Sequence, residues 1–113
     1  MQSGAGQEGE RRLAGKVAIV TGAARGTGAV VARHFAREGA RVLLGDVLDE
    51  RGESVAAEIG AAAHYRRLDV TLEEDWNAAV AEARSELGPP TVLVNNAAVV
   101  HLATVEETTP EIF

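Results

Sequence analysis

A glycine-rich turn directly after a short apolar run is the most informative segment of this sequence. The run covers residues 17–20, and residues 21–28 read T-G-A-A-R-G-T-G. An apolar run bounded by turn residues predicts a strand that is buried on both faces. Glycines after such a strand allow a tight turn, a close approach of the backbone to a pyrophosphate, and close packing of a helix on the strand.

The helix predicted after this turn runs from about Gly28 to Glu38, and Gly39 is well placed to end it. Its N-terminus would direct free N–H groups and the positive end of the helix dipole at a bound anion. A glycine-rich turn can also be purely structural. The predicted strand before it and helix after it favour the phosphate-binding interpretation.

Three further apolar segments predict strands. They are Arg41–Gly45, which ends at Asp46, then Ala63–Leu68, which closes on Asp69, and Thr91–Val94. Helical patterns separate these segments, and this alternation predicts an α/β fold with a parallel sheet and right-handed crossovers.

The helices between these strands carry start and stop signals. Asp49 can cap one helix that ends at Gly60. Residues 71–74, T-L-E-E, form a capping box for the next helix, which residues 88–90 stop. The apolar stripe of that helix consists of Leu72, Trp76, Val80, Ala83 and Leu87, and it predicts a core position for Trp76. Another helix is expected to start at Thr109-Pro110.

Composition and charge exclude several functional classes. The 113 residues suffice for one small domain, and the formal net charge of −6 argues against a nucleic-acid partner. The chain has no cysteine, which excludes thiol catalysis, and its histidines show no metal-ligand spacing. Residues 1–12 are polar and glycine-rich, which predicts a flexible tail and no signal peptide. No run approaches the about 20 apolar residues of a membrane helix, so we expect a cytoplasmic protein without membrane contact.

The spacing T-G-x-x-x-G-x-G resembles that of the classical short-chain dehydrogenase/reductase family. Residues 95–98, N-N-A-A, resemble the N-N-A-G of that family, and Leu68-Asp69-Val70 is a third match. These motifs follow predicted strands in the expected order. The resemblance implies a Rossmann-like parallel sheet with flanking helices, truncated after the fourth strand. Residues 13–113 would then be a partial NAD-binding Rossmann domain. Within the family, residues 45–50 and 68–76 look most like bacterial 3α(20β)-hydroxysteroid dehydrogenases.

Asp46 is the predicted selector of the cofactor. An acidic side chain at the end of the second strand can accept hydrogen bonds from the adenosine ribose and would repel a 2′-phosphate, which favours NAD over NADP. Arg25 favours NADP instead, because a basic residue before the second motif glycine often accompanies the use of NADP in the family. The two charges could also pair with each other, and Asp46 could merely end a strand.

The resemblance also implies roles for later residues. Asp69 would bind the adenine amino group with the Val70 backbone beside it, or it could be only a helix-entry residue. Asn95 would tie the fourth strand to the first turn, and residues 96–98 would line the nicotinamide-ribose side. Ala98 stands where the family usually has glycine, and His101 is read as a loop residue. The predicted cofactor-binding residues are Gly22, Arg25, Gly26, Thr27, Gly28, Asp46, Asp69, Val70 and Asn96.

Catalysis in the family needs a Tyr with a Lys four residues later. Tyr65 is the only tyrosine and Lys16 the only lysine, so this pair does not exist in these residues. We therefore expect the NAD-binding half of an oxidoreductase that acts on CH–OH or ketone groups and is inactive as this chain alone. Its small alcohol or ketone substrate would bind only in a full-length form. The alternatives are a stand-alone, non-catalytic nucleotide-binding or regulatory module, and a chain that does not fold stably by itself.

The fourth predicted strand is expected to lower the solubility of the chain. Family members place a fifth strand beside the fourth, so residues 92–94 would form an open edge with unpaired backbone groups. We expect self-association through this edge.

Overall fold

The structure, a computed structural model, describes residues 12–96. Its strands and helices alternate along the chain as predicted, and the helix expected at Thr109-Pro110 lies outside the described residues. The elements are β1 (Val17–Thr21), α2 (Gly26–Arg37), β2 (Arg41–Asp46), α3 (Asp49–Ile59), β3 (Ala63–Arg67), α4 (Glu73–Glu86) and β4 (Val92–Val94). The four strands form one parallel sheet in the order β3-β2-β1-β4. The predicted α/β, Rossmann-like fold class is confirmed.

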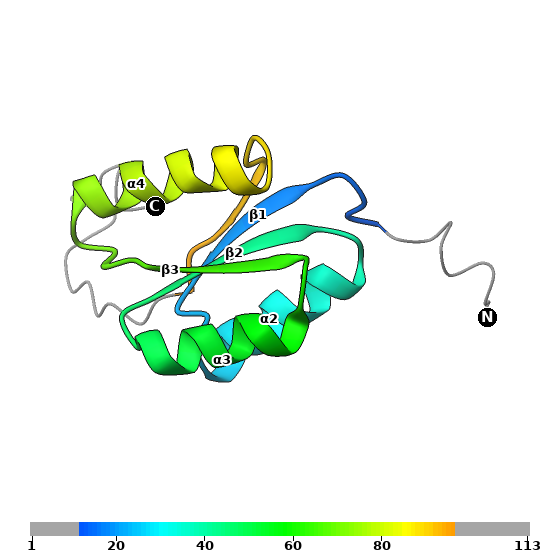
Figure 1. Cartoon of the computed structure of the whole chain (residues 1–113), viewed down its shortest axis with the longest axis horizontal. Helices are drawn as coiled ribbons and strands as arrows, with labels where there is room; N and C mark the ends of the chain where they lie inside the picture. The colour runs from blue at the N-terminus through cyan, green and yellow to red at the C-terminus, as the bar shows by residue number, and fades with distance from the viewer. Residues whose placement is uncertain (1–11, 97–113) are drawn as a thin grey trace, which may run out of the picture.

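The sheet is covered on both faces, with α2 and α3 on one side and α4 on the other (Figure 1). Successive residues of a strand point to opposite faces, so β1 and β2 feed two separate cores. Ile19 and Leu43 pack in the cluster that contains Trp76 of α4. Val20 packs in the cluster that contains Val55 of α3. Trp76 is 9% exposed, which confirms its predicted place in the core.

The predicted helix ends are confirmed. The C-cap residues of α2 and α4 are followed by Gly39 and Gly88, and α3 is capped by Gly60 itself. The φ values of Gly39, Gly60 and Gly88 are 100°, 99° and 126°. Backbone in this left-handed region is unfavourable for residues with a Cβ, so glycine ends a helix readily there.

Two predicted helix starts are wrong. Asp49 is the first residue of α3, and Leu48 occupies the cap position. The capping box at residues 71–74 does not form, because α4 starts at Glu73 with Leu72 at the cap and no side-chain cap hydrogen bond. The reason lies at Thr71, whose N–H and hydroxyl both donate to the Asp69 carboxylate, at 3.0 and 2.6 Å.

Smaller differences concern other element boundaries. The helix predicted from about Gly28 begins at Gly26. Leu72 lies before α4 and is 41% exposed, so the buried stripe of that helix starts only at Trp76. Arg12, the last residue of the expected tail, donates its backbone N–H to Glu38 at 3.3 Å. Residues 1–11 lie outside the described part. From residue 12 to residue 96, no helix is long and apolar enough to cross a membrane.

Candidate functional site

A cavity of about 550 Å³ opens at the carboxyl ends of the strands. It is lined by Gly22, Arg25, Gly26, Asp46, Val47, Leu48, Leu68, Asp69, Val70 and Asn96. These residues lie at the end of β2, at the start of α2 and in the segments that follow all four strands. Ligands of open parallel sheets bind in the crevice outside these strand ends, so the cavity lies where the fold would place a ligand.

The glycines of the turn after β1 serve different physical purposes. Gly22 and Gly26 have φ values of 64° and 58°, a backbone conformation that favours glycine. A Cβ at Gly26 would meet nothing within 4 Å, so only its backbone conformation demands glycine. Gly28 is buried, and a Cβ there would lie 2.0 Å from the Gly22 carbonyl oxygen and 2.8 Å from the Asn96 side-chain nitrogen. Gly28 therefore permits the close packing of α2 against the turn.

Helix α2 begins without a carboxylate of its own. Arg25 at its N-cap makes no side-chain cap hydrogen bond, and the first turn contains no acidic residue. The other two helices of residues 12–96 have acidic first turns, formed by Asp49 and Glu50 and by Glu73, Glu74 and Asp75. The first N–H groups of a helix lack intrahelical acceptors and carry the positive end of its dipole. The start of α2 is therefore suited to an anionic ligand.

The Asp46 carboxylate joins the loops after β1 and β2. One carboxylate oxygen accepts the Ala24 N–H at 3.0 Å. The other accepts the N–H groups of Val47 and Leu48 at 2.6 and 3.1 Å. Arg25 and Asp46 both line the cavity, yet none of the ion pairs between residues 12 and 96 joins them. The pairing of these two charges, which the sequence left open, is therefore not formed within the described residues.

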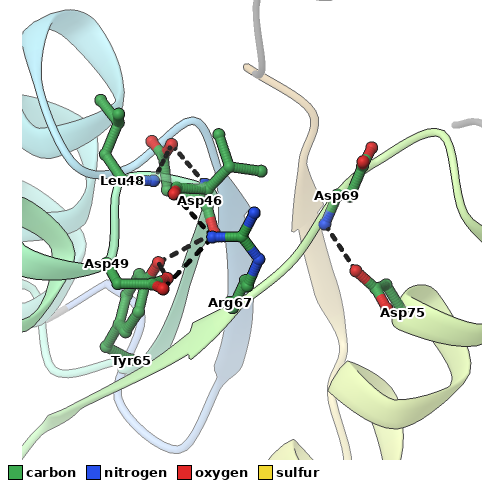
Figure 2. Close-up of polar contacts among 8 residues, drawn as sticks. Asp46, Leu48, Asp49, Tyr65, Arg67, Asp69 and Asp75 are labelled. Atoms are coloured by element: carbon green, nitrogen blue, oxygen red, sulfur yellow. Dashed lines mark hydrogen bonds and ion pairs between the residues drawn. The ribbon is translucent and has the colours of Figure 1, made fainter.

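Side chains of β3 hold the turn between β2 and α3 (Figure 2). The Tyr65 hydroxyl lies 2.8 Å from the Asp46 carbonyl oxygen and 2.6 Å from the Asp49 carboxylate. Arg67 donates to the Val47 carbonyl at 2.9 Å and to Asp49 at 3.2 Å. Burial and the hydrogen bond to Asp49 raise the pKa of the Tyr65 phenol well above its ordinary value. The hydrogen bond from Tyr65, with the nearby charge of Arg67, lowers the pKa of the Asp49 carboxyl.

Asp69 forms the opposite side of the cavity. Its carboxylate accepts two hydrogen bonds from Thr71, and these lower the pKa of the Asp69 carboxyl. Its backbone N–H donates to the Asp75 carboxylate of α4 at 2.8 Å (Figure 2). Asp69 is thus both a helix-entry residue and a residue of the cavity wall.

Thr21 links the ends of β1 and β4. Its hydroxyl donates to the Asn95 side-chain oxygen at 3.1 Å and accepts the Asn96 backbone N–H at 2.9 Å. Asn95 was predicted to tie the fourth strand to the first turn, and the structure shows it in contact with Thr21, the last residue of β1 and the first of the glycine-rich motif at residues 21–28. Asn96 is thereby fixed beside Gly28 at the cavity wall.

Comparison with known proteins decides the family. A family model described as short chain dehydrogenase matches residues 16–113. The chain belongs to the short-chain dehydrogenase family. The resemblance drawn from the motifs at residues 21–28, 68–70 and 95–98 is confirmed.

Two curated proteins are similar in sequence to this chain. The chain is 51% identical over 96 residues to a 3-alpha-(or 20-beta)-hydroxysteroid dehydrogenase of Mycobacterium tuberculosis, covering 85% of the chain and 37% of that protein. It is 48% identical over 99 residues to a 2,5-dichloro-2,5-cyclohexadiene-1,4-diol dehydrogenase of Sphingobium indicum, covering 85% of the chain and 40% of that protein. The chain therefore spans less than half the length of these relatives.

A solved structure supports the fold of this short-chain dehydrogenase chain. It is the 3-ketoacyl-(acyl-carrier-protein) reductase from Brucella melitensis complexed with NADH, with a TM-score of 0.75 and 42% sequence identity. The match covers 88% of this chain and 42% of that one.

Most of the predicted cofactor-binding residues line the cavity. Thr27 and Gly28 do not: Thr27 is exposed at the start of α2, and Gly28 is buried behind the turn. The sequence analysis missed Val47, Leu48 and Leu68, whose position directly beside two of the strand ends was the available indication. Residues 97 and 98, predicted to line the nicotinamide-ribose side, and His101, predicted to be a loop residue, lie outside the described residues.

Proposed function

We propose that residues 13–113 form the NAD-binding part of an oxidoreductase that acts on CH–OH or ketone groups, with a hydroxysteroid-like substrate. The observation that carries this proposal is the cavity at the carboxyl ends of the strands. It brings together the glycine-rich turn, Asp46, Asp69 and Asn96, which are far apart in the sequence. Hydroxysteroid dehydrogenases among the relatives and an NADH complex among the similar structures support it.

Each part of the cavity suits one part of the cofactor. The turn at Gly22 and Gly26 and the start of α2 would hold the pyrophosphate. Asp46 would accept hydrogen bonds from the hydroxyls of the adenosine ribose, and Asp69 with Val70 would hold the adenine. Thr27 and Gly28 would contribute through the backbone at the start of α2, and Asn96 would lie toward the nicotinamide ribose. The nicotinamide ring would supply hydride transfer when it is bound.

Asp46 is the basis for proposing NAD rather than NADP. Its carboxylate lies at the cavity wall and would repel the negative charge of a 2′-phosphate. A carboxylate offers about four acceptor positions, and backbone N–H groups engage three here. Capacity therefore remains for a ribose hydroxyl. Arg25 on the same wall is the residue that would favour NADP.

We further propose that these 113 residues do not catalyse the reaction by themselves. The single tyrosine, Tyr65, is bound to Asp46 and Asp49, and its raised pKa opposes proton transfer at neutral pH. The single lysine, Lys16, precedes β1. Incubation with NAD and assorted secondary alcohols is expected to yield no NADH above background, and turnover that follows the pure protein through chromatography would contradict this.

NAD titration of the chain tests the binding proposal directly. Binding without turnover agrees equally with the alternative of a non-catalytic module. An in-frame Y-x-x-x-K in the coding sequence downstream of Phe113 would favour the oxidoreductase.

A cytoplasmic location stays a prediction.

A further inference from the structure

Two consecutive peptide groups of the turn after β2 aim their N–H groups at the same oxygen of Asp46. The N–H of Val47 lies 2.6 Å from this carboxylate oxygen, and the N–H of Leu48 lies 3.1 Å from it. The position of the Asp46 carboxylate at the cavity wall therefore depends on the orientation of these two peptide groups.

Side chains of β3 hold the carbonyl ends of the same two peptide groups. A peptide group is planar, so fixing its carbonyl also fixes its N–H. The carbonyl of Asp46 belongs to the first group, and Tyr65 lies 2.8 Å from it. The carbonyl of Val47 belongs to the second, and Arg67 donates to it at 2.9 Å.

Asp49 joins the two β3 side chains at their tips. One of its carboxylate oxygens lies 2.6 Å from the Tyr65 hydroxyl, and the other lies 3.2 Å from Arg67 (Figure 2). The Tyr65 ring lies directly against Gly52 of α3, where a Cβ would be 2.1 Å from a ring carbon. The ring is thus seated in a slot that only a residue without a side chain leaves open.

We propose that Tyr65 and Arg67 are positioning residues for the Asp46 carboxylate and thereby set the affinity for the adenosine end of the cofactor. They act through the two peptide groups and need not touch the ligand. Neither residue lines the cavity. The inference rests on the proposed NAD-binding function, and it adds residues outside the motifs at residues 21–28, 68–70 and 95–98 that carry the family likeness.

The first test is Tyr65→Phe, which keeps the ring against Gly52 and removes the hydroxyl. The hydroxyl contacts the Asp46 carbonyl and the Asp49 carboxylate, and losing both contacts releases the first peptide group. We therefore expect the Kd for NAD to rise about threefold to tenfold. In an Asp46→Ala background the same change should have no further effect, because the carboxylate is gone. An equal loss of affinity in both backgrounds would show that Tyr65 does not act through Asp46, and would overturn the proposal.

Arg67→Met has a matched control in Arg33→Met. Arg33 of α2 also pairs with an exposed carboxylate, that of Glu58 of α3, through two hydrogen bonds of 3.0 Å, but Arg33 does not line the cavity. Both variants remove one positive charge and one surface ion pair. Arg67→Met should weaken NAD binding, and Arg33→Met should leave it within about twofold of the wild type, as expected for a weak surface pair.

Amide hydrogen exchange of the full chain without cofactor supplies an independent readout. Tyr65→Phe and Arg67→Met should speed exchange at Val47 and Leu48, and Arg33→Met should not. If the wild type does not bind NAD, the proposed function fails, and exchange alone then decides whether the two side chains hold the turn. Unchanged exchange at both amides together with an unchanged Kd in Tyr65→Phe would overturn the positioning role.

Discussion

The Asp46 carboxylate accepts the Ala24 N–H at 3.0 Å, which ties the end of β2 to the glycine-rich loop after β1. Asp46 is thus part of the scaffold of the cavity as well as a candidate contact for ribose. A substitution there changes both properties, so an affinity for NAD alone does not separate them. The ratio of the Kd values for NAD and NADP separates the two properties, because damage to the scaffold weakens the binding of both cofactors.

Asp46→Ala should lower the free energy of unfolding and narrow the preference for NAD. Loss of the hydrogen bonds to the charged acceptor is expected to cost about 1.5–3 kcal/mol. Urea unfolding measures the stability, and titration with each cofactor measures the preference. A variant as stable as the wild type would show that the contacts with Ala24, Val47 and Leu48 contribute nothing.

Gly28→Ala should be more damaging than Gly26→Ala. A Cβ at Gly28 would overlap the Gly22 carbonyl, so the backbone of the turn must move. At Gly26 the surroundings are open and only the left-handed backbone conformation opposes alanine, at about 1–2 kcal/mol. Thermal unfolding of the two variants compares these effects. The reverse order would mean that the packing of α2 on the turn tolerates a methyl group.

Gly52→Ala should be destabilising only while the Tyr65 ring is present. The added methyl would overlap that ring, and overpacking of this kind typically costs about 1–3 kcal/mol. In a Tyr65→Ala background the space is empty, and alanine should then stabilise α3 by up to about 1 kcal/mol relative to glycine. A double-mutant cycle by urea unfolding measures this change of sign. Equal effects in both backgrounds would rule out the slot.

The pH dependence of stability should follow Tyr65 and Asp49. The raised pKa of Tyr65 favours its neutral form in the folded state, so its contribution is present below the ordinary tyrosine pKa of about 10 and is lost as the pH rises above it. The pKa of Asp49 is lowered, so its contribution is present above the ordinary value of about 3.9 and is lost as the pH falls below it.

Tyrosinate absorbance gives the alkaline measurement directly, because Tyr65 is the only tyrosine. Native protein should ionise at higher pH than protein unfolded in urea, and Asp49→Asn should reduce the difference. Coincident titrations of the native and the unfolded protein would contradict the contacts of the Tyr65 hydroxyl.

The edge at β4 should make the isolated chain self-associate. Within residues 12–96, β4 pairs with β1 and with no other strand, and Leu93 is 46% exposed. Edge strands of this kind pair readily with other chains, and a charge on the edge opposes this. Size-exclusion chromatography with light scattering should show oligomers that Leu93→Lys reduces. A sharp monomer peak with cooperative unfolding of the wild type would show that four strands suffice.

The elements of the fold follow from local patterns, and the helix starts do not. Gly39, Gly60 and Gly88 indicate helix ends because their backbone conformation depends on the residue itself. The start of α4 depends on which group Thr71 contacts, and Asp69 competes for it. A capping motif read from the sequence cannot show that competition.

Some residues of the candidate site could likewise be predicted from the sequence, and others could not. Gly22, Asp46 and Asn96 were predictable because motifs and strand ends mark them. The contacts of Tyr65 and Arg67 depend on the register that places Tyr65 beside Leu44 and Arg67 beside Asp46 in the sheet. That register arises from the packing of whole strands, so the role of these side chains in holding the turn could be found only in three dimensions.

Titration of the wild-type chain with NAD and with NADP under the same conditions tests whether the cavity binds NAD and whether Asp46 selects it. We expect saturable binding of NAD, weaker binding of NADP, and a narrower preference for NAD in Asp46→Ala. No binding of either cofactor would contradict the proposed function. Tighter binding of NADP than of NAD would show that Arg25, and not Asp46, selects the cofactor.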